Sequence, residues 1–245
     1  MRGLRIVSVV LCLWAALAVP PAQADARTDA YHAAVAGAYR HYREAVHYLE
    51  NGNVELGAFA LDQFATAWRP IVSAYGTSPP PAYAKTPPER FNLVLLGILD
   101  VAQKSQATIG KRPPEQIARD LEQIRSALLL LRRINDVRVY ADCIDLMNRA
   151  TQRLWGFRSR PPVPNNAEAA IRYKVALYET TLWYRQCRDE APAAYRDTEE
   201  FRRLFDGALA SLAKLEGVDI AHTDALVSIL RELHSFDRLI WLRFG

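Results

Sequence analysis

Apolar residues recur at steps of three and four positions through most of the chain after residue 25, the spacing that gathers them on one face of a helix. Strict alternation of apolar and polar residues, which is typical of a half-buried strand, is nearly absent. Turn-forming residues separate the periodic segments, as at 51–53 and 160–164. The pattern therefore predicts an all-α protein of about eight helices, over residues 28–50, 54–75, 88–108, 114–133, 137–157, 167–189, 198–215 and 223–243.

Two local signals refine these boundaries. Thr86 and Glu89, and likewise Asp197 and Glu200, have the spacing of a capping box at the start of a helix. Pro70 lies inside the expected helix 54–75. Proline lacks an amide hydrogen and clashes with the preceding turn, so we expect a kink or a break there.

The second half of the chain repeats the pattern of the first. A shift of 110 residues places the helix at 88–108 on the helix at 198–215, and a shift of 106 aligns the last helix of each half. We therefore predict a tandem pair of four-helix up-down bundles, residues 25–135 and 136–245, packed separately or interleaved. The matches that carry most weight are Gly97 with Gly207, Phe91 with Phe201, and the lead-in Pro81-Ala82-Tyr83 with Pro192-Ala193-Ala194-Tyr195.

The start of the chain has the composition of a secretory signal peptide. Arg2 and Arg5 precede an apolar run at 6–19, shorter than the roughly 20 residues that span a bilayer. Residues 22–24 form an Ala-x-Ala cleavage site. An uncleaved membrane anchor is the alternative, but the run is short and prolines follow it. We predict cleavage after Ala24 and a periplasmic protein.

Charge restricts the class of partner. The formal net charge of +4 falls to +2 without the leader, which contains two arginines and no acid. This small excess does not favour nucleic acid, whose binding proteins are strongly basic. Residues 104–160 carry 12 Lys and Arg against 6 Asp and Glu, which could attract an anionic partner or a membrane surface. Solvated arginine-rich helix faces are the favoured explanation.

Two cysteines remain after the leader, Cys143 and Cys187. An exported chain with two cysteines can form one disulfide bond. Closing the loop between them would stabilise the fold by about 4 kcal/mol. The bond also requires the two side chains to face each other, so the sequence leaves both the bridged and the reduced form open.

Candidate metal ligands occur in the first helix. His41, Glu44 and His47 include the Glu-x-x-His spacing of di-iron bundles. A helical wheel places Glu44 opposite the apolar stripe, with His47 outward, His41 on the flank and Arg43 on the same outer face. A solvated polar face is therefore favoured over a metal site, and the second Glu-x-x-His that a di-iron bundle needs is missing.

The last helix contains a clearer anomaly. Asp237 falls inside its apolar arc and His234 lies at the edge. The corresponding positions in the first half are Leu131 and Leu128. A carboxylate among leucines is costly unless it is paired or hydrogen-bonded. We expect an ion pair with an arginine of a neighbouring helix, and a metal or ligand site is the alternative.

Haem and catalytic chemistry have little support. The chain has no Cys-x-x-Cys-His, so covalent haem attachment is not expected. A non-covalent haem between Met147 and His234 is conceivable, although a lone methionine more often fills a gap in the core. Gly-x-Ser-x-Gly and glycine-rich phosphate loops do not occur. We therefore expect no enzymatic activity.

One segment resembles a known family. The succession of Tyr, Leu, Gly-Asn and Trp residues over 39–75 is loosely similar to imelysin-like periplasmic proteins, which are linked to iron uptake. The Gly-x-His-x-x-Glu signature of that family does not occur, and only His41 and Glu44 match its second part. The resemblance would imply a metal carrier or, less directly, a hydrolase.

These observations lead to one function and a rival. We expect an exported, non-catalytic helical protein that binds a periplasmic or envelope protein or presents a groove between its halves. The rival is a periplasmic metal- or haem-binding carrier. Convergence of His234 and Asp237 with a further histidine or acid in a cavity would favour the carrier, whereas an adjacent arginine would indicate a structural role. The carrier's candidate ligands are His41, Glu44, His47, His234 and Asp237.

Overall fold

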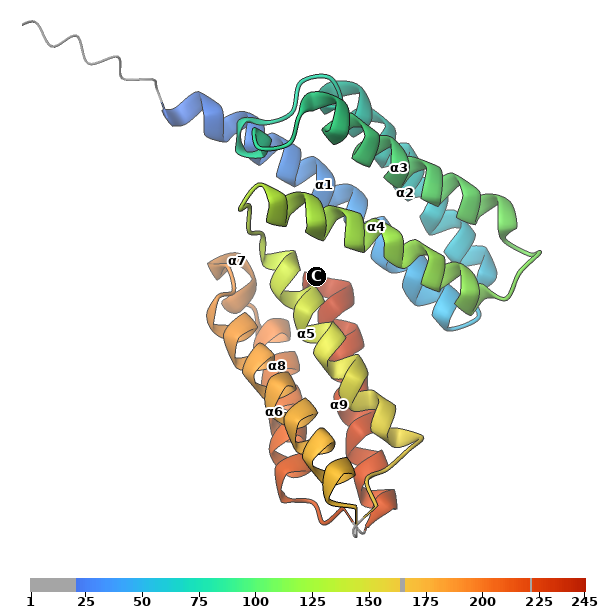
Figure 1. The fold of residues 1–245 in the computed structure, drawn as a ribbon, viewed down its shortest axis with the longest axis vertical. Coiled ribbons are helices and arrows are strands. Elements are labelled where there is room, and N and C mark those ends of the chain that lie inside the picture. Colours follow the sequence, from blue (N-terminus) through green and yellow to red (C-terminus); the bar gives the residue numbers. More distant parts are fainter. Residues whose placement is uncertain (1–20, 164–165, 221) are drawn as a thin grey trace, which may run out of the picture.

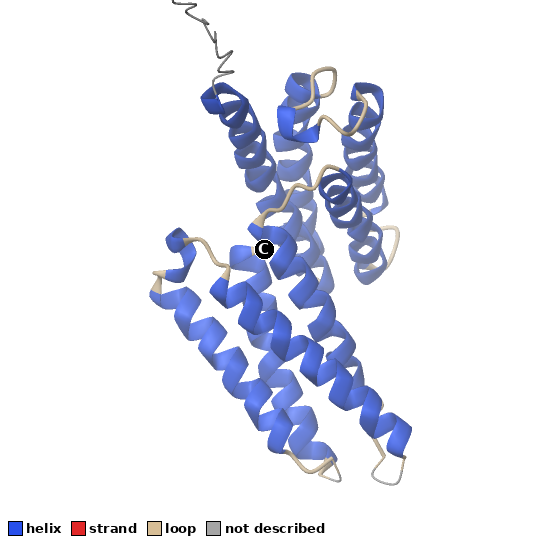
Figure 2. Ribbon diagram, turned by 60° about the vertical axis from the view of Figure 1, so that its left-hand side comes forward, coloured by secondary structure: helices blue, strands red, loops and turns tan. Residues whose placement is uncertain are grey.

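The structure, a computed structural model, describes residues 21–163, 166–220 and 222–245. Every regular element in these ranges is helical, and the described residues contain no strand (Figure 2). The all-α prediction is confirmed. The predicted leader lies outside the described residues except for 21–24, which belong to the first helix.

The helices agree with the predicted segments to within a few residues at most ends. Two short 3-10 turns and the four-residue helix α7 were not predicted, and the longest disagreement is at the first helix, which begins at Pro21 instead of residue 28. The elements are α1 (Pro21–Glu50), α2 (Val54–Tyr75), η1 (Pro81–Tyr83), α3 (Pro88–Thr108), α4 (Pro114–Ile134), α5 (Tyr140–Trp155), η2 (Gly156–Arg158), α6 (Ala167–Asp189), α7 (Ala193–Arg196), α8 (Glu199–Gly217) and α9 (Thr223–Phe244).

Neither predicted capping box is formed. The N-cap of α3 is Pro87, which has no capping side chain, and not Thr86. Thr198, not Asp197, caps α8, because its hydroxyl accepts a hydrogen bond from the Phe201 amide at 3.2 Å. Pro70 does not split α2, which continues through it. Pro70 is exposed, so water can replace the amide hydrogen bond that the proline removes.

Helix contacts run mainly within each half of the chain. Helix α1 packs against α2 and α4, and α3 completes the ring by contacting α2 and α4; in the same way α5 and α8 each contact α6 and α9. Figure 1 shows α1–α4 as one group of helices and α5–α9 as a second. Contacts between α1 and α9 join the two groups near the connection from α4 to α5. Independent folding of residues 25–135 and 136–245 stays a prediction.

Aromatic rings fill the core of the first group. The rings of Tyr31 and Phe91 lie 5.8 Å apart, and those of Phe64 and Trp68 lie 5.5 Å apart. The buried indole of Trp68 donates a hydrogen bond to the Leu95 carbonyl at 2.9 Å. Such rings bury large apolar areas, and the indole N–H has the partner it needs.

The aligned positions of the repeat have related but unequal surroundings. Phe91 and Phe201 are both fully buried, and each lead-in forms one short helical turn, η1 and α7. The glycines differ. A Cβ on Gly207 would lie 2.4 Å from the Phe236 ring, whereas a Cβ on Gly97 would meet open space. Of these two aligned glycines, only Gly207 lies where a side chain would clash with a neighbouring helix.

Candidate functional site

A disulfide bond joins α5 to α6. Cys143 and Cys187 are bonded with a Cα–Cα distance of 5.6 Å, in the usual range for such bonds. This outcome selects the bridged form that the sequence left open. Next to it, the Tyr140 hydroxyl donates a hydrogen bond to the Cys187 carbonyl at 2.9 Å. The disulfide bond and this hydrogen bond together fix the N-terminal end of α5 against the C-terminal end of α6.

A buried ion pair connects the two halves. Arg125 of α4 is 3% exposed and Asp145 of α5 is fully buried, with Arg125 Nε 3.0 Å from Asp145 Oδ1. Two further donors reach the same carboxylate: the Tyr39 hydroxyl at 3.1 Å and the Trp241 indole N–H at 3.0 Å. Four helices, α1, α4, α5 and α9, therefore meet at one carboxylate, and its buried charge is compensated.

Asp237 belongs to the same polar network, as its place in the apolar arc suggested. The carboxylate is fully buried and accepts hydrogen bonds from the Tyr184 hydroxyl at 3.0 Å and from Asn148 Nδ2 at 2.6 Å. Asn148 Oδ1 in turn accepts a hydrogen bond from Arg125 at 3.1 Å. The expected ion pair of Asp237 with an arginine is therefore wrong, because Arg125 reaches this carboxylate only through Asn148. Burial raises the pKa of Asp237 to about 6.

The predicted outward position of Arg43 is wrong. Its side chain is 6% exposed, and Nε donates a hydrogen bond to the Leu242 carbonyl of α9 at 3.2 Å. The guanidinium also lies over the Tyr39 ring. The helical wheel assumed that α1 has one buried face, but α9 covers a second face of this helix.

The candidate metal ligands of the first helix contact other side chains of the protein. His41 Nδ1 lies 3.0 Å from Glu44 Oε2, and both side chains are partly exposed. Arg238 of α9 points an Nη2 atom at His47 Nδ1, 3.4 Å away. Burial and the Arg238 charge lower the pKa of His47. These side chains form a polar rim beside the contact between the two halves.

His234 lies elsewhere in the second half. Its ring stacks on Trp155 with centroids 4.3 Å apart and planes 7° from parallel. Burial and the charges of Arg238 and Arg158 lower its pKa to about 4, so the ring is neutral at pH 7. Met147, the suggested haem ligand, is fully buried in the hydrophobic core.

The structure does not gather the candidate ligands into one site. Among the described residues, no three His, Cys, Asp or Glu side chains are placed to hold a metal ion. Asp237 meets a tyrosine and an asparagine and not a further acid or histidine. Metal or haem binding by His41, Glu44, His47, His234 and Asp237 therefore rests on the sequence alone.

Ion pairs offset only part of the basic excess of residues 104–160. Five of its cations, three of them exposed, pair with acids. The pairs are Lys104–Asp100, Arg112–Asp120, Arg125–Asp145, Arg132–Asp142 and Arg153–Glu179. Only Asp100 and Glu179 lie outside the segment, so these pairs lower its excess by two charges. Among its cations without such a pair, Arg133 and Arg138 line the cleft described next.

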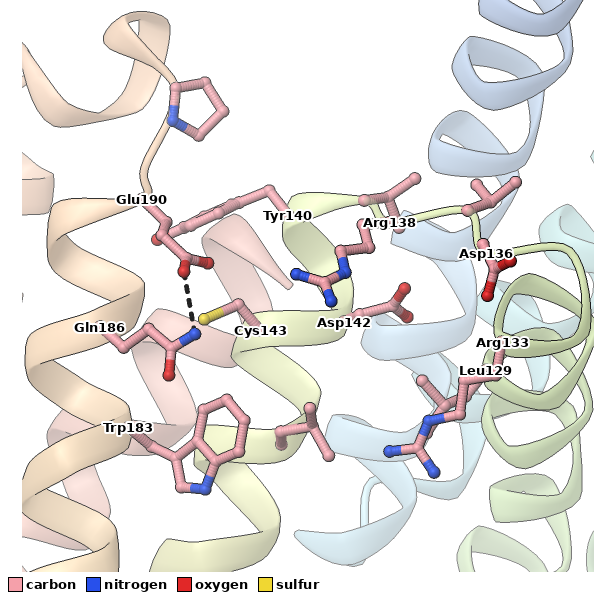
Figure 3. A pocket seen from close by; sticks show the side chains of 14 residues that line it. Leu129, Arg133, Asp136, Arg138, Tyr140, Asp142, Cys143, Trp183, Gln186 and Glu190 are labelled. Carbon is pink, nitrogen blue, oxygen red and sulfur yellow. Dashed lines mark hydrogen bonds between the residues drawn. The ribbon is translucent and has the colours of Figure 1, made fainter. Parts of the chain in front are cut away.

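A cleft of about 880 Å³ lies where the two halves meet (Figure 3). One wall is the C-terminal end of α6, the other is the last turns of α4, and the first turns of α5 lie between them. The connection from α4 to α5 closes the cleft at the end where the two halves join. The side chains at its surface include Leu129, Arg133, Asp136, Arg138, Tyr140, Asp142, Cys143, Trp183, Gln186 and Glu190.

The walls are held in place by polar contacts. Arg132 clamps Asp142 with Nε 3.0 Å from Oδ2 and Nη2 2.5 Å from Oδ1. The connection itself is fixed by Asn135, whose Oδ1 accepts a hydrogen bond from the Lys85 amide at 3.0 Å. Asp136, at a φ of 54°, forms an ion pair with the Lys85 side chain. The cleft is thus shaped by both halves before any ligand arrives.

The cleft contains three acids and two arginines that form no ion pair, and one of the acids, Glu190, accepts a hydrogen bond from Gln186 and has no cation partner among the described residues. Asp142 and Asp136 are paired with Arg132 and Lys85, outside the cleft lining. No ion pair joins Arg133 or Arg138 to an acid within the described ranges, and both side chains are exposed. Apolar surface from Leu129, Leu146 and Trp183 also lines the cleft. The arrangement suits a ligand with carboxylates and an apolar group.

Sequence reasoning missed most of the polar network and did not identify which helices line the groove that it expected between the halves. Arg125 was a detectable signal, because it lies between Leu121 and Leu128 on the apolar stripe of its helix. Asp145 likewise follows Ile144 within a buried stretch. The cleft had no such signal, since its walls come from three helices and depend on how the two halves pack.

Comparisons with known proteins add no function. No protein-family model matches the chain, and no curated protein or solved structure matches it either. The loose similarity to imelysin-like proteins is therefore not supported by a family match. Within the described ranges, no helix has the length and hydropathy to cross a bilayer.

Proposed function

We propose that this chain is an exported, non-catalytic helical protein that binds an acidic segment of a periplasmic or envelope protein in the cleft between α4, α5 and α6. The observation that carries the proposal is the pair of unengaged arginines, Arg133 and Arg138, beside the apolar surface around Trp183. Arginine and tryptophan are the residue types that most often dominate protein interfaces.

Preorganisation supports this choice. The Cys143–Cys187 bond fixes α5 to α6, and the Arg132–Asp142 pair fixes α4 to α5. A site with fixed walls loses little conformational freedom when a ligand enters, so more of the contact energy appears as affinity. The cleft combines polar and apolar side chains, as protein interfaces do.

Two observations support export. The start of the chain has the layout of a secretory leader. Disulfide bonds persist in oxidising compartments such as the periplasm and are rare in the cytosol, and this chain forms one between its two remaining cysteines. The cleft contains one of these cysteines, so its geometry depends on that compartment.

A non-catalytic role fits the chemistry of the buried groups. Asp145 and Asp237 are the most unusual carboxylates of the structure, yet both are fully buried and satisfied by neighbouring donors. A general acid or base must reach the substrate proton. These two carboxylates instead fix the packing of α4, α5, α6 and α9.

Site-specific photo-crosslinking in cells tests the proposal. A benzoylphenylalanine replaces Trp183 or Gln186 in the cleft, and Leu93, 67% exposed on α3, serves as the control position. We expect both cleft positions, but not position 93, to form an adduct with the same envelope protein. The double variant Arg133→Glu/Arg138→Glu should suppress it. Equal adducts at all three positions, or none at the cleft, would contradict the proposal.

A further inference from the structure

Helix α6 has an apolar stripe on its solvent side. Ile171, Val175, Tyr178 and Leu182 are 61%, 51%, 64% and 45% exposed. Their spacing of four, three and four residues is that of core positions in a coiled coil. Single exposed apolar residues are common, but a continuous row on one helix face usually marks a contact surface.

The stripe is distinct from the face by which α6 joins its own half. Tyr173, Leu177 and Tyr184 are buried and pack toward α5 and α8. A helix that covers a core normally has polar residues on its opposite face, whereas α6 has this apolar row there, with Arg172 and Lys174 exposed beside it. The cleft uses Trp183 and Gln186, which lie at other positions around the helix.

Charged residues of opposite sign end the stripe. Glu168 precedes Ile171 by three residues, and Arg185 follows Leu182 by three, so both continue the same spacing. Both side chains are exposed. Glu168 pairs with Arg172 one turn away, with both side chains more than half exposed, and such exposed pairs contribute little stability. Arg185 forms no ion pair with an acid among the described residues.

This order of residues is complementary to itself when reversed. If two α6 helices lie antiparallel and centred between residues 176 and 177, Val175 faces Tyr178 of the partner subunit and Ile171 faces Leu182 of the partner subunit. The same register places Glu168 opposite Arg185 of the partner subunit at both ends. A parallel pair would instead place like charges together, which is unfavourable.

We propose that the chain forms a homodimer through an antiparallel pair of α6 helices. The order of charges along the stripe favours pairing with a second copy of the chain, and it favours the antiparallel direction. A shallow groove of about 470 Å³ lies beside the stripe, and its lining includes Val175, Phe157 and Ala176. A side chain of the partner subunit can enter this groove. Tyr178 of the partner subunit, opposite Val175, lies over this groove. Four apolar side chains from each subunit make a small interface, so we expect micromolar and reversible association.

Sedimentation equilibrium of the full, disulfide-bonded protein over a range of micromolar concentrations tests the dimer. We expect a reversible increase from the mass of one chain to that of two. Val175→Glu should raise the dimer dissociation constant at least about 100-fold, because it buries two unpaired carboxylates at the centre of the seam. Leu93→Glu, at an exposed apolar site on α3, should have no effect. Both variants should retain the parent circular dichroism spectrum.

Charge reversal tests the register. Glu168→Arg or Arg185→Glu alone should each weaken the dimer about 10-fold, since each makes two facing pairs repulsive. The double variant should restore the parent dissociation constant. A protein that remains a single chain throughout, a dimer insensitive to Val175→Glu, or a double variant weaker than either single variant would overturn the proposal.

A membrane role for the stripe is a separate outcome that would also overturn it. A single-chain species that sediments with phosphatidylglycerol vesicles, and loses this behaviour on Val175→Glu, would assign the stripe to lipid. The crosslinking from Trp183 does not depend on the stripe. Val175→Glu should therefore leave the cleft adduct unchanged, which separates failure of the dimer from failure of the cleft proposal.

Discussion

The two halves of this protein place different chemistry at matching positions. Leu131 of α4 and Asp237 of α9 occupy corresponding positions in the repeat, and both are buried. The first half surrounds its position with aromatic and aliphatic side chains, whereas the second supplies Tyr184 and Asn148 as donors. Helix geometry thus decides that a position is buried, and the neighbouring helices decide which side chain can occupy it.

The difference extends to how each half is stabilised. Helices α1–α4 contain no disulfide bond in the part of the chain that the structure describes, and their core contains aromatic rings in contact with one another. Helices α5–α9 have a covalent link and two buried carboxylates. The second half should therefore respond to reductant and to pH more strongly than the first.

The largest effect is expected at the carboxylate that both halves share. Asp145→Ala leaves Arg125 buried without its counter-ion and removes the acceptor of Tyr39 and Trp241. We expect a loss of about 5 kcal/mol in the free energy of unfolding, at the upper end for breaking a buried pair. Urea denaturation followed by circular dichroism measures it.

The matched control for that prediction is the outer acid of the same arginine. Glu122 lies 3.6 Å from Arg125 and is 44% exposed, so Glu122→Ala should cost less than about 1 kcal/mol. Equal losses for Glu122→Ala and Asp145→Ala would show that the buried pair has no special role at the junction.

The second-largest effect is expected on removal of the disulfide bond, and it should differ between the two halves. Cys143→Ala/Cys187→Ala opens a link between residues 44 positions apart, which should lower the free energy of unfolding by about 4 kcal/mol. Hydrogen exchange should report faster exchange in α5 and α6 than in α2 and α3. Uniformly faster exchange in both halves would mean that they unfold as one unit, contrary to the predicted boundary at residue 135.

The smallest effect concerns Asp237 and pH. Burial raises its pKa to about 6, above the unfolded value of about 4. The folded state therefore binds the proton more tightly, and the stability that this carboxyl contributes is fully present below about pH 4 and lost as pH rises through 6. Tyr184→Phe removes a donor to the ionised form, so it should cost about 2 kcal/mol at pH 7.5 and about 1 kcal/mol at pH 4.

Tyr173→Phe provides the comparison for the tyrosine experiment. The Tyr173 hydroxyl donates to the Leu215 carbonyl at 3.1 Å, a partner that does not titrate. Its loss should cost about 1 kcal/mol at both pH values. If Tyr184→Phe were also independent of pH, Asp237 would not titrate in this range.

The sequence was sufficient for features that depend on one helix at a time. Helical periodicity predicted the elements, and the position of Asp237 within an apolar arc correctly indicated a buried carboxylate. Two cysteines after the predicted leader made a bond between Cys143 and Cys187 one of two open outcomes, and the structure contains it. In each case a local pattern carried the information.

Features that depend on packing between the halves were not predictable in this way. Arg43 was placed in solvent because nothing in the first helix indicates that α9 covers it. Arg133 and Trp183 are distant in sequence and line one cleft only because α4 and α6 converge beside α5. Such sites are properties of the assembly of helices, so periodicity in one helix cannot reveal them.

The hydrogen bonds made by α9 imply an order in which the helices pack during synthesis of the chain. Trp241 donates to Asp145, and the Leu242 carbonyl accepts from Arg43, although Arg43 is made about two hundred residues earlier. Burying an arginine without its acceptor is costly. The first helix therefore reaches its final environment only after α9 has been synthesised and has packed against it.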